Sequence, residues 1–173
     1  SKKEIFMNSI TIEEKDLNSG VFVINQAKFK NKTAYTCIRM TDDIKSLLKQ
    51  KCSGALDIAI IGLLNHGLSK LKEQNKAIEI KNIDGNIHFI EHDKTTGNSY
   101  INVKAKIQRE SSKSFSIRMD KDLKERLKEA SGNISYSVGI LGVIKYSLFM
   151  LEKNNKALII KNTDANIDNS YFI

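Results

Sequence analysis

The sequence predicts an α+β fold built from two similar units in tandem. Three observations lead to this prediction. The chain contains an internal repeat, each copy has a short alternating strand that runs straight into an amphipathic helix, and a second, very apolar helix follows. We expect each unit to contain a β-hairpin, a strand, two helices and a short final strand.

The repeat is visible in matched tripeptides. Ile38-Arg39-Met40 recurs as Ile117-Arg118-Met119, an offset of 79 positions (117 minus 38). Beyond the two helices, Asn75-Lys76-Ala77 recurs as Asn155-Lys156-Ala157, an offset of 80 positions (155 minus 75). The second copy therefore carries one extra residue, which we place in the turn between its two helices.

The hairpins are predicted from β-prone runs on either side of Gly-containing polar turns. The first unit (1–82) then contains a hairpin at 8–28 and a strand-helix-helix core at 33–75. The second unit (83–173) contains a hairpin at 86–108, a core at 113–155 and a C-terminal tail at 156–173.

The core strands alternate between apolar and polar residues. In 114–119, Phe115, Ile117 and Met119 alternate with Ser and Arg, and 35–40 shows the same pattern. One face of each strand should therefore be buried and the other exposed. Because each copy offers the other a like strand, we expect the two to pair antiparallel as a two-stranded ribbon. Pairing of like strands between two chains is the alternative.

The helices show a period near 3.6 residues. Leu123, Leu127 and Ala130 mark the buried face of a short helix that follows Asp120, a favoured N-cap residue, and Thr41 holds the same place in the first copy. Gly62 and Gly142 occupy matching positions inside the apolar helices. A mid-helix Gly costs about 1 kcal/mol relative to Ala, so we expect two backbones to cross closely there.

Charge and cysteine content bear on partner and compartment. Lys and Arg number 28 against 20 Asp and Glu, a net charge of +8, which favours nucleic acid or an acidic membrane surface as partner. Cys37 and Cys52 do not suggest a disulfide framework. The N-terminus lacks the apolar run of a signal peptide, and the apolar stretch at 134–151 is interrupted by polar residues. We expect a cytoplasmic protein that does not enter the membrane.

The strand-helix-helix core resembles the ribbon-helix-helix (MetJ/Arc) class of DNA-binding proteins. The matching residues are the strand 115–120, the short helix 121–131, the Gly132-Asn133 turn and the start of the long helix at 135–138. This resemblance implies two tandem ribbon-helix-helix units that form an intramolecular pseudo-dimer. It also implies that the ribbon enters the major groove of double-stranded DNA.

The resemblance further implies two groups of DNA-contacting residues. The base-reading residues, on the outward ribbon positions, would be Tyr35, Cys37, Arg39, Ser114, Ser116 and Arg118. The phosphate-binding residues, ahead of the strands and at the start of the long helix, would be Lys30, Lys32, Lys113, Ser135, Tyr136 and Ser137. Asp57, near the start of the first copy's long helix, departs from the pattern because its charge repels phosphate.

An enzyme is a poor fit to the sequence, which has no Gly-rich phosphate loop, nucleophile elbow or paired-carboxylate motif. His88 and His92 have a spacing that holds zinc on a helix, but they fall in a predicted hairpin, so we expect no metal and no cofactor.

The sequence therefore predicts a sequence-specific DNA-binding protein: a transcriptional repressor, or a plasmid accessory protein in partition, replication control or conjugation. Self-association along DNA and a protein partner bound through the hairpins are further expectations. The alternative is a protein-interaction or assembly module that uses the same core without reading DNA.

Overall fold

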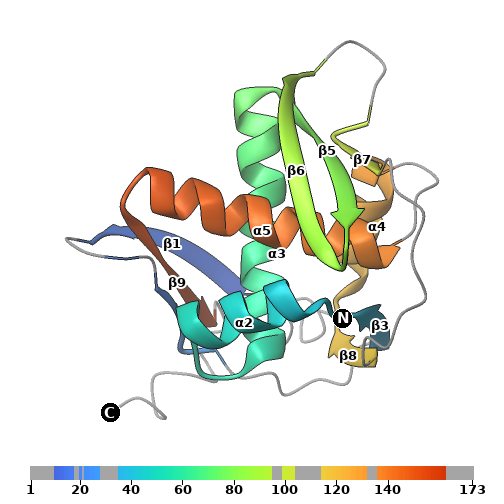
Figure 1. The fold of residues 1–173 in the computed structure, drawn as a ribbon. Helices are drawn as coiled ribbons and strands as arrows, with labels where there is room; N and C mark the ends of the chain where they lie inside the picture. Colours follow the sequence, from blue (N-terminus) through green and yellow to red (C-terminus); the bar gives the residue numbers. More distant parts are fainter. Residues whose placement is uncertain are drawn as a thin grey trace.

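The computed structural model describes residues 10–17, 20, 22–27, 35–94, 99–103, 114–131 and 136–162. This part of the chain forms a mixed α+β fold of four helices and three small sheets (Figure 1). The predicted α+β class is confirmed. The helices are α2 (Asp42–Lys51), α3 (Leu56–Gln74), α4 (Lys121–Ser131) and α5 (Tyr136–Lys153).

The strands form three sheets, two of which join segments far apart in the sequence. They are β1 (Ile10–Asp16), β2 (Val23–Asn25), β3 (Tyr35–Arg39), β4 (Cys52–Ser53), β5 (Lys76–Ile83), β6 (Asn86–Asp93), β7 (Ile101–Val103), β8 (Ser114–Arg118) and β9 (Lys156–Asn162). One sheet has the order β1-β9-β2-β4, a second has the order β6-β5-β7, and β3 pairs with β8 alone.

The two long helices, α3 and α5, cross at the centre of the molecule (Figure 1). They approach closely at Gly67, where an added Cβ would lie 2.8 Å from Val143 Cγ1 and 3.1 Å from the Val143 carbonyl oxygen. The crossing is therefore built on a residue without a side chain. Around it lies one apolar core that includes Leu64, Ile144 and Leu71, all fully buried.

Gly62 and Gly142 have a different role from the one predicted. A Cβ at Gly142 would lie 2.5 Å from Cγ1 and 2.9 Å from Cγ2 of Ile80 on β5. A Cβ at Gly62 would lie 2.6 Å from Cγ1 of Ile160 on β9. The expectation that two backbones cross there is wrong, because each glycine makes room for an isoleucine from the sheet that packs on its helix.

The two predicted hairpins do not form. Between β1 and β2 lies β9, antiparallel to β1 and parallel to β2. In the same way β5 lies between β6 and β7. The physical reason is burial: β5 and β9 bury more apolar side chains than their neighbours, with Ile78, Ile80, Leu158 and Ile160 fully buried, so they take the central positions.

These two sheets therefore each combine the final strand of one repeat with the first strands of the other. One tight hairpin does form, between β5 and β6, through Asp84 and Gly85. Both residues have positive φ, 51° and 80°, as the favoured two-residue hairpin turn requires. This hairpin crosses the point at which the sequence repeat divides the chain.

The start of α4 is capped as predicted. The Leu123 backbone N–H donates to Asp120 Oδ1 at 2.6 Å. Thr41 occupies the N-cap position of α2 but makes no side-chain cap. Its hydroxyl donates instead to Asp43 Oδ1 at 2.5 Å, and the other oxygen of Asp43 accepts the Ile87 backbone N–H at 2.8 Å, which ties α2 to β6.

Candidate nucleic-acid interface

Strands β3 and β8 form an antiparallel two-stranded ribbon within the single chain. The register pairs Cys37 with Ser116 at the centre, with Tyr35 opposite Arg118 at one end and Arg39 opposite Ser114 at the other. In Figure 1 this ribbon lies apart from the other two sheets. A two-fold relation between the copies carries Arg39 onto Arg118, because their positions differ by the repeat offset of 79.

The two faces of the ribbon differ in burial. Ile38 and Ile117 are fully buried, and Met40 and Met119 follow them into the core. Cys37, Arg39 and Ser116 are exposed on the opposite face. The apolar side therefore fixes the ribbon to the helices and leaves polar and cationic groups in solvent.

Cys37 and Ser116 meet at the centre of the exposed face. The Cys37 Sγ and Ser116 Oγ atoms lie 3.3 Å apart across the two strands. For the other three predicted base-reading positions, Tyr35, Ser114 and Arg118, the structure describes the backbone only. The register places each of these three positions two residues from the central pair.

The start of α5 contacts the ribbon directly. Ser137 Oγ accepts the backbone N–H of Arg39 at 3.4 Å, which satisfies a donor at the edge of β3. This bond places the first turn of α5 beside one end of the ribbon. Tyr136 is described by its backbone only. The remaining predicted phosphate-binding residues lie outside the described residues: Lys30, Lys32, Lys113 and Ser135.

The start of α3 is filled by the protein's own side chains. Asn25 on β2 accepts the Ala55 backbone N–H at 3.3 Å and donates to the Ser53 and Ala55 carbonyl oxygens at 2.6 and 2.9 Å. The Ile58 N–H donates to Asp57 Oδ1 at 2.9 Å. The free N–H groups that would hold an anion at a helix start are therefore partly used here.

Gly54 makes this closed turn possible. Its φ is +81°, and a Cβ there would lie 2.7 Å from Asn25 Cγ. The start of α3 is therefore closed by Asn25 and Asp57. Sequence reasoning found Asp57 but missed Asn25, because the contact joins positions 30 residues apart in the chain.

A buried polar network lies where α3 crosses α5, next to β1. His66 is 3% exposed, its Nδ1 lies 2.7 Å from Ser147 Oγ, and its Nε2 lies 2.7 Å from Glu14 Oε1. Lys70 Nζ lies 3.1 Å from the same Glu14 oxygen. Because a carboxylate only accepts, Nε2–H donates to Glu14 and Nδ1 accepts from the Ser147 hydroxyl in neutral His66.

The pKa shifts agree with this arrangement. Burial lowers the pKa of His66 and outweighs the opposing effect of Glu14. Burial alone would raise the pKa of Glu14, but hydrogen bonds from His66 and Lys70 lower it overall. A neutral imidazole beside an ionised carboxylate is therefore the stable pair. The sequence placed His66 on the helix but could not show its partners.

The two cysteines differ in chemical environment. Cys37 is an exposed free thiol at the centre of the ribbon. Burial raises the pKa of the Cys52 thiol to about 12. Because the thiolate is the reactive form, Cys37 is the thiol open to reagents at neutral pH.

No protein-family model, curated protein or solved structure matches the chain. Of the helices that the structure describes, none has the length and apolar character needed to cross a membrane. Within the described ranges, His, Cys, Asp and Glu side chains do not gather in groups of three or more that could hold a metal ion. His88 and His92 lie on β6, and His92 Nε2 is 3.0 Å from Glu79 Oε2.

Proposed function

We propose that this chain is a sequence-specific DNA-binding protein that inserts the β3–β8 ribbon into the major groove. In this proposal the β3-α2-α3 and β8-α4-α5 segments are tandem ribbon-helix-helix units that form a pseudo-dimer in one chain. The observation that carries it is the two-faced ribbon, whose Ile38 and Ile117 face is fully buried while Cys37, Arg39 and Ser116 are exposed.

The dimensions and the chemistry of the ribbon support this use. A major groove about 12 Å wide admits a two-stranded ribbon, and Arg bonds guanine O6 and N7 together. Arg39 and Arg118 lie two residues from the central pair in opposite directions. Four residue steps of about 3.4 Å separate them by about 14 Å along the ribbon, or about four base pairs.

The two halves of the recognition surface are not equivalent. Arg39 and Arg118 are related by the repeat, but Tyr35 corresponds to Ser114 and Cys37 to Ser116. The α3 start is also closed by Asn25 and Asp57. We therefore expect a DNA site in which two guanines are contacted in the same way while the neighbouring base pairs differ. The phosphate backbone should be held more firmly on the side of α5. Repression, plasmid partition, replication control and conjugation are the roles open to such a protein.

Selection from a randomised pool of duplex DNA, followed by titration across salt, tests the proposal. We expect one enriched short motif and an affinity that falls steeply as salt rises. The Arg39→Ala/Arg118→Ala double variant should lose the motif. Lys128→Ala, which removes an exposed cation from the last turn of α4, should keep it. Salt-sensitive binding without a motif would leave a basic, non-specific DNA binder, and no binding at low salt would leave the chain as an assembly module.

A further inference from the structure

A cavity of about 300 Å³ lies between α3 and α4, away from the polar face of the ribbon. Leu68 of α3 and Ala130 of α4 form its apolar wall, and Tyr100, just before β7, closes one side. This volume is at the lower end of the range for small-molecule sites. The cavity can therefore hold a compact ligand with a single ring or a short chain.

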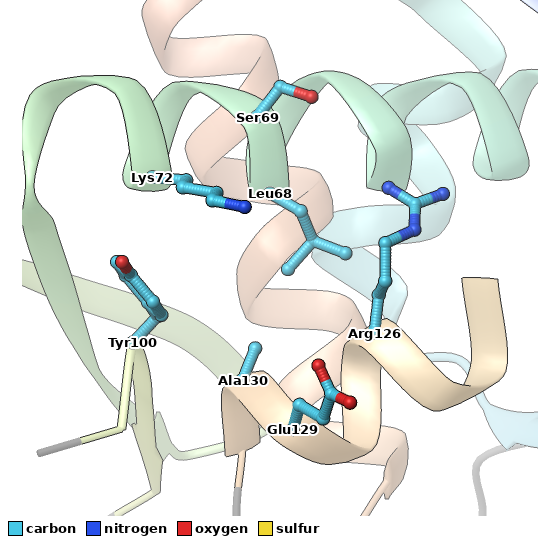
Figure 2. Close-up of a pocket in the computed structure, with 7 residues that line it drawn as sticks. All are labelled: Leu68, Ser69, Lys72, Tyr100, Arg126, Glu129 and Ala130. Atoms are coloured by element: carbon cyan, nitrogen blue, oxygen red, sulfur yellow. The ribbon is translucent and has the colours of Figure 1, made fainter. Parts of the chain in front are cut away.

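Two cations line this cavity. Figure 2 shows Lys72 reaching in from α3 on one side and Arg126 rising from α4 on the other, with Leu68 between them. Glu129 is the single carboxylate of the lining. Among the residues that the structure describes, no carboxylate pairs with Lys72. The lining therefore has one more cation than carboxylates, and because Arg126 is paired with Asp122, Lys72 is the cation that most favours an anion.

The guanidinium of Arg126 is held in place before any ligand arrives. Its Nε donates to Asp122 Oδ2 at 2.9 Å, and its Nη2 donates to Asn65 Oδ1 on α3. These two bonds use two of the five N–H groups of the side chain. A ligand that accepts hydrogen bonds from the remaining N–H groups meets a donor that is already fixed. Its binding therefore loses less side-chain entropy than binding to a mobile Arg would.

Apolar and aromatic groups lie between and beside the cations, with Leu68 between Lys72 and Arg126 and Tyr100 on the side of Lys72 (Figure 2). The Lys94 ammonium lies 4.5 Å from the centroid of the Tyr100 ring, so one face of this ring is already covered by a cation. The rest of Tyr100 and the Leu68 side chain are left to the cavity. A ligand that satisfies both sides carries an anionic group on a small apolar body.

The fold does not require these cations. The repeat places Glu152 at the position of Lys72 (72 plus 80) and Leu47 at the position of Arg126 (126 minus 79). Phe22 takes the place of Tyr100, since each accepts a backbone hydrogen bond from the central strand of its sheet, at 3.1 and 2.8 Å. The cationic lining therefore belongs to one half only, which allows one site per chain.

We infer that this cavity binds a small amphipathic anion, whose phosphate or carboxylate group lies at the cationic lining formed by Lys72 and Arg126 and whose apolar body packs on Leu68 and Tyr100. The site is separate from the ribbon and does not depend on DNA binding. Calorimetric titration of the full chain with three probes tests it: phenyl phosphate, inorganic phosphate and benzyl alcohol. Phenyl phosphate should bind once per chain and more tightly than either partial probe.

Charge variants decide whether the binding takes place in this cavity. Lys72→Gln should weaken phenyl phosphate binding by about tenfold, the loss of one charge-assisted hydrogen bond. Glu129→Gln should tighten it, because the repelling carboxylate is gone. Lys128→Gln, an exposed cation on the same helix outside the cavity, should leave it unchanged. The unliganded melting temperatures of all three variants report whether they fold.

Three results would overturn the inference. The first is no heat from phenyl phosphate at millimolar concentration. The second is an equal loss in the Lys72→Gln and Lys128→Gln variants, which would mean a general charge effect. The third is weaker phenyl phosphate binding in Glu129→Gln, which would mean that this carboxylate supports the binding instead of repelling the anion.

Discussion

Replacing Gly142 with Ala tests the packing of α5 on its sheet. An added Cβ would meet Cδ1, Cγ1 and Cγ2 of Ile80, a residue that is fully buried, all within 2.9 Å. Such overpacking costs about 1–3 kcal/mol. The gain in helix propensity from Gly to Ala, about 1 kcal/mol, offsets part of this cost. We therefore expect Gly142→Ala to leave the free energy of unfolding unchanged or to lower it by up to about 2 kcal/mol.

Gly139 in the same helix supplies the matched control. A Cβ there would lie 3.7 Å from Ile101 Cγ2, an ordinary contact. Gly139→Ala should therefore gain the propensity of about 1 kcal/mol without a clash. The two variants should differ by about 1–3 kcal/mol, which is a difference of several degrees in melting temperature.

Urea unfolding followed by circular dichroism measures both values. In an Ile80→Ala background the penalty of Gly142→Ala should vanish, because the three atoms that the new Cβ meets are gone. Equal stability of Gly139→Ala and Gly142→Ala in the wild-type background would refute the reasoning that Gly142 makes room for Ile80.

Three further predictions concern the ribbon and the buried network. Arg39→Ala and Arg118→Ala should each weaken the free energy of DNA binding by about 1–3 kcal/mol. The two variants should relax the base preference of the selected site at different positions, about four base pairs apart. Loss of preference at one shared position would contradict the register. Lys113→Ala should weaken binding to all sequences alike and reduce the slope of log affinity against log salt by about one unit; a change in the selected motif would assign it a base contact instead. The pKa of His66 is lowered in the folded chain, so the unfolded chain binds a proton at this residue more readily. The contribution of His66 to the free energy of unfolding should therefore be complete above pH ~6.5 and decline as the pH falls below that value. His66→Gln should flatten that decline in urea melts at several pH values, whereas His88→Gln, at an exposed position, should keep it.

Alternation and helical periodicity predicted the parts of the fold that depend on local burial. The alternation around Ile38 and Ile117 predicted which face of the ribbon is buried and which is exposed. The similarity of the two strands predicted that they pair antiparallel. Helix α4 follows the predicted cap at Asp120. In each case the chemistry of a few neighbouring residues decides the outcome, so one sequence is enough.

The pairing of the outer strands could not be predicted from alternation. A strand pattern shows which face is buried but not which strand lies beside it. The position of β9 between β1 and β2, and of β5 between β6 and β7, decides the two larger sheets. Asp84-Gly85 is a strong hairpin signal in the sequence. The repeat pattern hides this hairpin, because the boundary between the two repeats at 82/83 falls inside it.

The exposed candidate residues were easier to predict than the contacts that surround them. Cys37, Arg39 and Ser116 are exposed where the alternation put them. The closure of the α3 start by Asn25, the pairing of His66 with Glu14 and Ser147, and the cationic cavity all join segments distant in sequence. Their residues carry no local pattern, so only the folded chain reveals them.

The reactivity of Cys37 provides the most direct test of the central claim that the outer ribbon face meets DNA. The Cys37 thiol is exposed at the centre of that face. Burial raises the pKa of the Cys52 thiol to about 12, so Cys52 should react slowly with an alkylating reagent at neutral pH. Alkylation by a maleimide would be timed with and without a saturating amount of the selected duplex, and mass spectrometry would assign the modified cysteine. The account predicts that the duplex protects Cys37 and that salt high enough to release the DNA restores its reaction. An unchanged Cys37 rate in the saturated complex would contradict the claim and move the DNA contact to another face.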